Sequence, residues 1–142
     1  MTFTTRPTLQ GTTGMVSSTH WIASQAAMGQ LERGGNALDA AVTAGFVLHV
    51  VEPHLNGPGG EVPAIVATAN DPTPRVLAGQ GPAPAAASID HFTSLGLDLV
   101  PGSGPLAACV PGAVDAWLLL LRDLGTMTLV EVLEPAIGYA AA

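Results

Sequence analysis

One stretch of the sequence constrains the fold more than any other, because it is apolar on nearly every side of a helix. Residues 37–51 are mostly alanine, valine, leucine and phenylalanine, and one aspartate and one histidine are the only ionisable residues among them. Asn36 can cap the start of this helix, and Glu52-Pro53 ends it, since the residue before a proline is pushed out of the helical region. The stretch falls short of the roughly 18 uninterrupted apolar residues of a membrane span. A helix that is apolar all round is normally buried in a large protein, so the chain is predicted to be part of a larger molecule.

The remaining sequence predicts short helices and one hairpin. Apolar residues recur about every three to four positions over 19–33, which predicts a helix capped by Ser18 or Thr19 and stopped by Gly34-Gly35. Apolar runs at 62–68 and 75–77, joined by a turn rich in Asn, Asp and Pro, predict a β-hairpin. The other expected elements are a strand at 14–18, a short helix within 85–97, a strand at 106–110, a helix at 113–124, and a helix from Thr128 toward Tyr139 that Pro135 kinks or ends early. Residues 1–13 are predicted to be a flexible lead-in, and residues 14–142 an incomplete domain.

The charge of the chain excludes several classes of partner. Of its 142 residues 48% are hydrophobic and 11% are charged, and four arginines against eleven acids give a net charge of −7. Such a chain lacks the basic surface of a nucleic-acid-binding protein or of a peripheral protein on an anionic membrane. The single cysteine, Cys109, excludes an intrachain disulfide framework and is expected to be a small buried residue. The Thr-rich start, 1–14, has no apolar core and is unlike a secretory signal, so a cytoplasmic location is expected.

The sequence gives weak support to three general kinds of site. The glycine-rich loop 56–60 follows a helix and precedes a strand, whereas phosphate-binding loops lead from a strand into a helix. The spacing of His49, Glu52 and His54 matches no common zinc pattern, and a hydrogen-bonded core histidine is the commoner explanation of His49. The serines before the first helix and Cys109 lack a recognised nucleophile motif, so Ser18 is more simply a cap. No metal site is predicted.

Several short motifs follow one another in an order that is more specific than any one of them. These motifs are Gly14–His20 with Ala23-Ser24, Gly34–Val42, Val51–Gly60, Gly79–Ala86, Val110–Val114 and Glu134–Ile137. In this order they resemble the amino-terminal part of the large subunit of the γ-glutamyltransferase (γ-glutamyltranspeptidase) family, within the N-terminal-nucleophile hydrolase superfamily. The resemblance covers nearly the whole chain from residue 14 onward.

The resemblance implies an α/β fold, a partial αββα sandwich of the N-terminal-nucleophile hydrolase type, of which this chain supplies a helix-rich N-terminal portion with a β-hairpin. It also implies a precursor that cuts itself into two subunits, with a nucleophilic threonine exposed at the start of the small subunit and no metal or organic cofactor. The chain ends at Ala142, before any such threonine, so no catalytic residue is expected in it. Its expected partner is the missing C-terminal part or small subunit. Alone it is expected to be inactive and to self-associate through apolar helix faces.

Four residues are predicted to lie near the substrate. In γ-glutamyltransferases the segment before Ala-Pro carries an arginine that grips the substrate's α-carboxylate, and the matching position here is Gln80. Glutamine cannot make the bidentate, charge-assisted contact that arginine makes with a carboxylate. Asn56, Gly60 and Glu61 are weaker candidates; Glu61 stands where transferases continue in glycine, and the favoured interpretation is that it caps the strand facing water. The segment containing His54 is expected to have a structural role.

The sequence therefore predicts the N-terminal portion of an amidohydrolase or acylase that cleaves or transfers a γ-glutamyl or related acyl group from a small amide. The alternative is a non-catalytic remnant of the family that binds a partner through its apolar helices. A processed threonine, in this reading frame or in a second chain, distinguishes the two. A third hypothesis, a metal-dependent hydrolase that uses the histidines, predicts stoichiometric metal.

Overall fold

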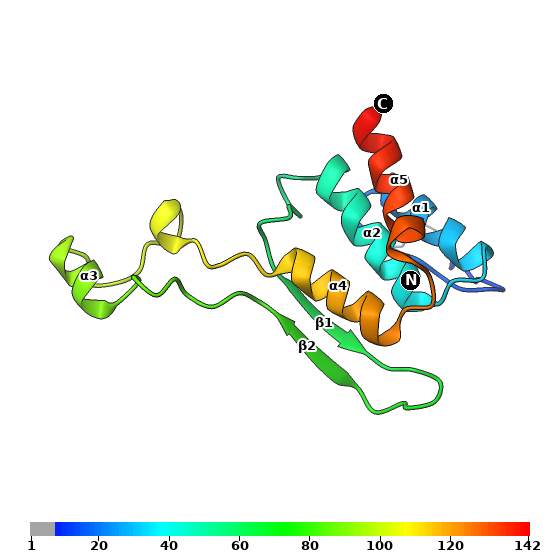
Figure 1. Ribbon diagram of the computed structural model, residues 1–142, viewed down its shortest axis with the longest axis horizontal. Helices are drawn as coiled ribbons and strands as arrows, with labels where there is room; N and C mark the ends of the chain where they lie inside the picture. The colour runs from blue at the N-terminus through cyan, green and yellow to red at the C-terminus, as the bar shows by residue number, and fades with distance from the viewer. Residues whose placement is uncertain (1–7) are drawn as a thin grey trace, which may run out of the picture. The chain divides into compact units, whose positions relative to one another are not determined.

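The computed structural model describes residues 8–142, which belong to two compact units. Of the described residues, the first unit contains 8–56 together with Leu120–Ala142, and the second runs from Gly57 to Leu119. The elements in chain order are α1 (Trp21–Glu32), α2 (Ala37–Val51), β1 (Val62–Val66), β2 (Arg75–Gly79), α3 (Ile89–Ser94), the 3-10 helix η1 (Pro105–Ala107), α4 (Ala113–Leu124) and α5 (Leu129–Ala141) (Figure 1).

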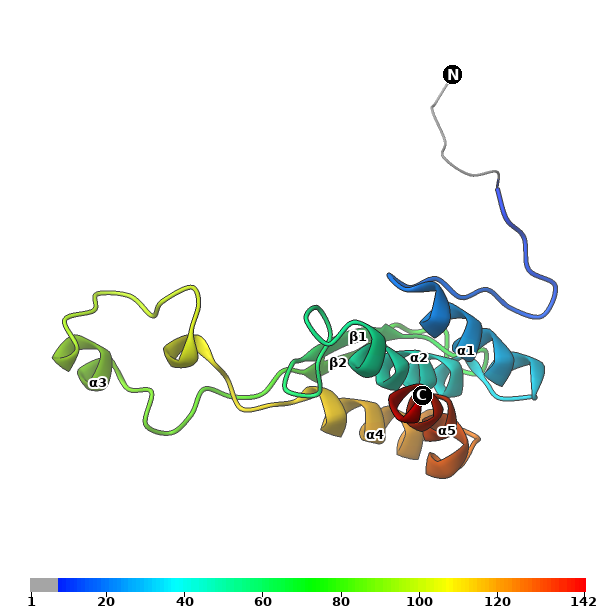
Figure 2. The ribbon, with the colours of Figure 1, turned by 90° about the horizontal axis from the view of Figure 1, so that it is seen from above.

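The core of the first unit lies where α2 contacts α1 and α5. The three helices lie side by side in both ribbon views (Figures 1 and 2). Ala23, Ala26, Val47 and Ala136 form a buried apolar cluster with one or two residues from each helix. Apart from Ala37, every residue of α2 is buried or half-buried. The prediction of a buried helix over 37–51 is therefore confirmed, with the boundaries expected from the sequence.

The start of α2 is capped by Asn36, as predicted. The Asn36 Oδ1 atom accepts hydrogen bonds from the backbone N–H groups of Leu38 (2.8 Å) and Asp39 (3.0 Å), while Asp39 Oδ2 accepts from the Asn36 N–H (2.8 Å). The Asn36 Nδ2 atom also donates to the carbonyl oxygen of Leu124, at 2.7 Å. The Asn36 side chain thus caps the start of α2. It also donates a hydrogen bond to the last carbonyl of α4, which has no partner within its own helix.

The carboxylate of Asp39 is fully buried and ties α2 to the loop between α4 and α5. Oδ1 accepts from the N–H groups of Thr126 (2.9 Å) and Met127 (3.1 Å), and Oδ2 also accepts from the Thr126 hydroxyl (2.6 Å). Burial raises the pKa of Asp39, but the hydrogen bonds from the Thr126 hydroxyl and from the N–H groups of Met127, Asn36 and Thr126 outweigh it and hold the pKa below its ordinary value. Asp39 is therefore a buried anion held by polar donors, and its role is structural.

Pro135 was expected to kink α5 or end it early, and the early end is wrong because α5 continues to Ala141. A proline has no N–H, so the carbonyl of Glu131, four residues before it, loses its helical partner. The Nε2 atom of Gln30 donates to that carbonyl at 2.9 Å. Gln30 is fully buried in α1, which explains a polar side chain in this helix interface. The interhelical hydrogen bond replaces the one that proline removes.

The second unit is built on an antiparallel hairpin of β1 and β2, as predicted. The register pairs Val62 with Gly79 and Ile65 with Val76. On one face Val62 packs with Ala113 and Ala116 of α4 in a small buried cluster. On the other face Ile65 and Val76 are 77% and 74% exposed, so both faces of the hairpin are apolar and only one is covered by the described residues. The observed fold is a helix-rich α/β arrangement with a two-stranded sheet, in agreement with the predicted class.

Three local predictions are wrong. No strand forms at 14–18, and α1 is capped not by Ser18 or Thr19 but by His20, whose Nδ1 accepts from the Ile22 N–H at 3.2 Å. Residues 106–110 form no strand; η1 covers 105–107 instead, with Pro105 at its first position, where a proline favours a helical start. The predicted lead-in lies partly outside the described residues, and 8–13 contain no helix or strand.

No helix in the described residues combines the length and the apolar character needed to cross a membrane.

Candidate functional site

Segments far apart in the second unit meet at the N-terminus of α4. The carbonyl oxygen of Gly60 accepts hydrogen bonds from the N–H groups of Gly112 (3.1 Å) and Ala113 (3.0 Å). These N–H groups at the start of α4 have no intrahelical partner, so the Gly60 carbonyl caps the helix. The glycine-rich loop before β1 is thereby fixed to the Val-Pro-Gly segment that precedes α4.

The segment after β2 reaches the same place. The Val110 N–H donates to the Pro82 carbonyl at 3.0 Å. A Cβ atom on Gly112 would lie 2.7 Å from the Gly79 oxygen and 2.9 Å from the Gly81 nitrogen, and a Cβ atom on Gly81 would overlap the Val110 carbonyl. Such contacts are closer than side chains allow, so glycine is required for the two backbones to approach. Residues 79–82 and 110–112 therefore lie directly against each other.

The structure brings two of the four predicted site residues together through this arrangement. Gly60 touches Gly112 through its carbonyl, and the Gln80 backbone lies against the same glycine, where a Cβ would meet the Gln80 carbonyl carbon at 3.2 Å. The Gln80 side chain is exposed, and Glu61, next to Gly60, is exposed as well. Asn56 belongs to the first unit, where its N–H donates to the Glu52 carbonyl at 2.9 Å. The arrangement can present a neutral amide beside the N-terminus of a helix.

The histidines do not assemble into a metal site in the described part of the chain, where no group of three or more His, Cys, Asp or Glu side chains could hold an ion. Half-buried His49 packs edge-on against Phe46, with ring centroids 5.5 Å apart. Its Nε2 atom has no hydrogen-bond partner among these residues, which corrects the expectation of a hydrogen-bonded core histidine. Burial lowers the pKa of His49, so the neutral ring is favoured. His54 is exposed.

The remaining nucleophile candidates are also placed by the structure. Cys109, expected to be buried, is exposed, and so are its neighbours Ala108 and Val110. The Ser18 hydroxyl donates to the His20 carbonyl at 2.7 Å and shares a 2.7 Å hydrogen bond with the Ser24 hydroxyl. No histidine side chain contacts Ser18 in these hydrogen bonds, so a nucleophile–base pair is not formed there.

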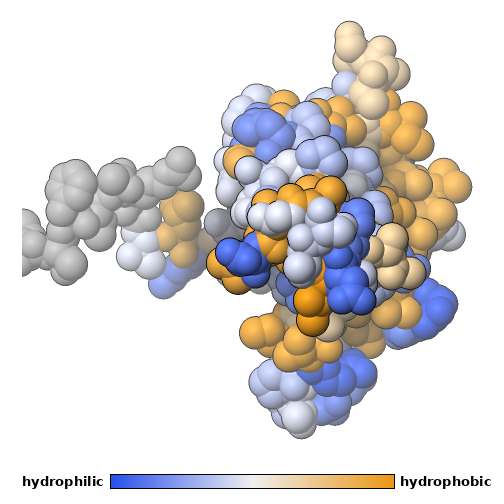
Figure 3. Space-filling view, turned by 90° about the vertical axis from the view of Figure 1, so that its left-hand side faces the viewer, coloured by the Kyte–Doolittle hydropathy of each residue, from blue (hydrophilic) through white to orange (hydrophobic). Residues whose placement is uncertain are grey.

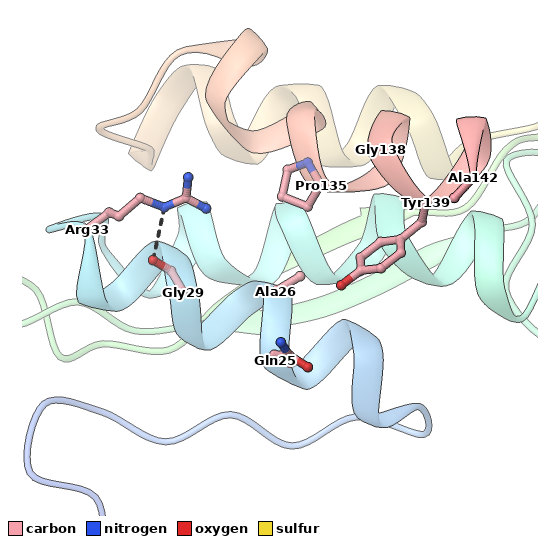
Figure 4. Close-up of a pocket in the computed structure, with 8 residues that line it drawn as sticks. All are labelled: Gln25, Ala26, Gly29, Arg33, Pro135, Gly138, Tyr139 and Ala142. Carbon is pink, nitrogen blue, oxygen red and sulfur yellow. Dashed lines mark hydrogen bonds between the residues drawn. The ribbon is translucent and has the colours of Figure 1, made fainter.

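Sequence reasoning missed an open groove of about 480 Å³ in the first unit. Figure 4 shows it between α1 and α5, with Arg33 and Tyr139 at its two ends. Small residues line much of its length, which is why no local sequence signal marks it. Arg33 is engaged by its own helix and by α5: its Nε donates to the Gly29 carbonyl at 3.2 Å, and its guanidinium lies 3.7 Å from the Glu134 carboxylate. The groove contains none of the predicted site residues.

Comparison with known proteins identifies the family. The family model described as gamma-glutamyltranspeptidase matches residues 23–142. The chain therefore belongs to the γ-glutamyltranspeptidase family, as the order of its motifs predicted.

The similar proteins are much longer than this chain. It is 39% identical over 131 residues to the glutathione hydrolase-like YwrD proenzyme of Bacillus subtilis, covering 92% of this chain and 25% of that protein. It is 36% identical over 136 residues to the oxamate amidohydrolase proenzyme of Klebsiella pneumoniae, and this match covers 91% of this chain and 25% of that protein. The solved structure of LmbA2991HD is similar at a TM-score of 0.88 and 68% identity, covering 97% of this chain and 24% of that one. The chain thus spans about a quarter of the length of the curated relatives it matches.

Proposed function

We propose that this chain is the N-terminal portion of an amidohydrolase or acylase that cleaves or transfers an acyl group from a small amide. The nucleophile is a threonine outside this chain, released by self-processing of a longer polypeptide. Gln80 contacts the acyl group of the substrate. The backbones of Gly60 and Gly112 hold the Gln80 backbone in position. The relatives named as a glutathione hydrolase-like proenzyme and an oxamate amidohydrolase proenzyme support amide hydrolysis as the reaction class.

The observation that carries this proposal is the meeting of the Gly60, Gln80 and Gly112 segments at the N-terminus of α4. In the sequence they are separate motifs of the family, and in the structure they form one backbone-to-backbone assembly. Close backbone packing fixes the Gln80 main chain while its side chain remains exposed. The rigid main chain fixes the point from which the Gln80 side chain extends, beside the N-terminus of α4, and leaves its amide open to a bound substrate group.

The charges of the second unit favour a substrate other than a γ-glutamyl compound. Arg75 is the one arginine between Gly57 and Leu119, and the chain has no lysine. It stands at the far end of β2 from Gly79, about 13 Å away along an extended strand. This unit therefore places no arginine or lysine side chain next to Gln80 that could bind the α-carboxylate of a substrate. We infer that the enzyme acts poorly on γ-glutamyl amides and better on amides whose acyl group lacks that carboxylate.

The substitution Gln80→Arg tests this inference in the complete polypeptide that carries the segment. We expect kcat/KM for a chromogenic γ-glutamyl anilide to rise about ten- to a hundredfold, because a charged hydrogen bond contributes about 1.5–3 kcal/mol. The matched control is Gln80→Asn, which stays neutral and should give no gain. Processed Gln80→Arg protein without any gain on the γ-glutamyl substrate would contradict the assignment of Gln80 to substrate binding.

A further inference from the structure

The register of the hairpin places Glu61 opposite Gln80. At the open end of the hairpin, away from its turn, Val62 pairs with Gly79. Continued by one residue, the same antiparallel register sets Glu61 opposite Gln80. Residues directly opposite each other in such a pair point to the same face, with Cβ atoms about 4.5–5.5 Å apart. The carboxylate of Glu61 and the amide of Gln80 therefore extend from neighbouring points.

The alternation of buried and exposed residues along both strands continues through these two positions. Val62 packs on α4, and a Cβ atom on Gly79 would lie 2.5 Å from the Ala116 Cβ atom of that helix. Glu61 and Gln80 come one residue later on each strand and are exposed. The other exposed residues on this outer face of the hairpin are Pro63, Ile65, Val76 and Ala78.

The apolar part of this outer face does not by itself mark a ligand site. Large apolar side chains are exposed in many other parts of the described chain, and the space-filling view shows apolar surface open on one side of it (Figure 3). What distinguishes the open end of the hairpin is the polar pair of Glu61 and Gln80.

Gly112 holds the main chain beside both members of the pair. Its N–H donates to the Gly60 carbonyl at 3.1 Å, and this carbonyl belongs to the peptide bond that joins Gly60 to Glu61. A Cβ atom on Gly112 would lie 3.2 Å from the carbonyl carbon of Gln80. The main-chain positions of Glu61 and Gln80 are therefore fixed by packing, although both residues lie just beyond the ends of β1 and β2.

The two side chains are open to a ligand in the described part of the chain. Neither of them takes part in a hydrogen bond or an ion pair there. Arg75, the cation of the hairpin, stands opposite Val66 at the other end of the strands. An ionised carboxylate only accepts hydrogen bonds, and an amide oxygen accepts as well. The pair therefore suits a ligand group that carries positive charge and several N–H donors.

We propose that Glu61 determines substrate specificity together with Gln80, by binding a protonated amine on the acyl group of the substrate. This inference rests on the proposed function and names its substrate class, an amide whose acyl group carries an amine and no carboxylate. The Glu61 carboxylate accepts a charge-assisted hydrogen bond from the ammonium group, and the Gln80 side-chain oxygen accepts another. The same carboxylate repels a substrate carboxylate at this position.

Four chromogenic anilides with related acyl groups test the proposal on the complete, processed polypeptide. The 4-aminobutyryl anilide carries the amine, the glutaryl anilide the carboxylate, the γ-glutamyl anilide both, and the butyryl anilide neither. We expect kcat/KM for the 4-aminobutyryl anilide to exceed that for the butyryl anilide about ten- to a hundredfold, the effect of one charged hydrogen bond. The γ-glutamyl and glutaryl anilides should each react more slowly than the 4-aminobutyryl anilide.

Substitutions of Glu61 separate a role in specificity from a role in structure. Glu61→Gln should remove the preference for the 4-aminobutyryl over the butyryl anilide, chiefly through KM, because it removes the charge and keeps the size. Glu61→Asp keeps the charge on a shorter side chain and should retain part of the preference. The matched control is Asp71→Asn, which removes a charge from an exposed position in the turn of the same hairpin and should keep the full preference. A purely structural role would change the rates for both anilides together.

The outcomes distinguish this inference from the proposed function. A processed parent enzyme that hydrolyses the butyryl and 4-aminobutyryl anilides equally well would overturn the role of Glu61 and leave amide hydrolysis standing. An unchanged preference in Glu61→Gln would do the same. A polypeptide that is never processed, or that hydrolyses none of the four anilides, would overturn the proposed function and this inference with it.

Discussion

Replacing Asp39 with alanine is expected to lower the free energy of local unfolding around the α4–α5 loop by about 3–5 kcal/mol. The substitution leaves the N–H groups of Asn36, Thr126 and Met127 and the Thr126 hydroxyl without their shared acceptor in a buried setting. Native-state hydrogen exchange of the Thr126 and Met127 amides in the complete polypeptide measures the loss directly. The exchange rates should rise more than a hundredfold, since about 1.4 kcal/mol corresponds to a factor of ten.

The control for this substitution is Asp98→Ala, which removes the same charge from an exposed position and should change stability by no more than about 0.5 kcal/mol. The pH dependence supplies a second readout. Because the pKa of Asp39 is lower in the folded state, its contribution is fully present above the unfolded pKa of about 3.9 and is lost as pH falls through the folded pKa. Asp39→Ala should remove this acid-dependent component. Equal acid sensitivity in the variant and the parent would show that the carboxylate is not the anchor.

Replacing Gly81 with alanine is expected to destabilise the second unit by about 3 kcal/mol, the upper part of the range for overpacking. The new methyl group would overlap the Val110 carbonyl, and both partners are backbone, so no side chain can rotate away. The 79–82 and 110–112 segments would have to separate, and Gln80 would lose its position. Thermal unfolding of the complete polypeptide, followed by activity at a temperature where the variant is folded, measures both effects.

The matched control is Gly59→Ala, because a Cβ at this glycine meets nothing within 4 Å. Its unfolding midpoint should stay close to that of the parent protein. If Gly81→Ala were as stable as Gly59→Ala, the close approach of the two backbones would not exist in solution, and the candidate site would lose its main support.

Local signals predicted much of the fold. Asn36 caps α2 and Thr128 caps α5 because a short polar side chain before an apolar helix satisfies the first free N–H groups. The hairpin followed from two apolar runs around a turn. The sequence could not show that α5 continues through Pro135. The Glu131 carbonyl, which loses its helical hydrogen bond to the proline, accepts one from the Gln30 side chain instead, and Gln30 lies 101 residues away in the sequence. The absence of a strand at 106–110 likewise depends on what the chain packs against.

The candidate site was predictable only in part. The order of the motifs pointed to the family, and Gln80 drew attention because it stands where the family's pattern has an arginine. That Gly60 and Gln80 both meet Gly112 depends on backbone contacts between segments far apart in the chain, which no local spacing reveals. The contact between Gln80 and a substrate remains a prediction.

The most direct test of the central claim is intact-mass analysis, with N-terminal sequencing, of the native product isolated from its source. A self-processing amidohydrolase predicts two chains, one of which contains this segment while the other begins with threonine. A single uncleaved chain, with no second chain that begins with threonine, would contradict the account and would favour a non-catalytic role for this member of the family.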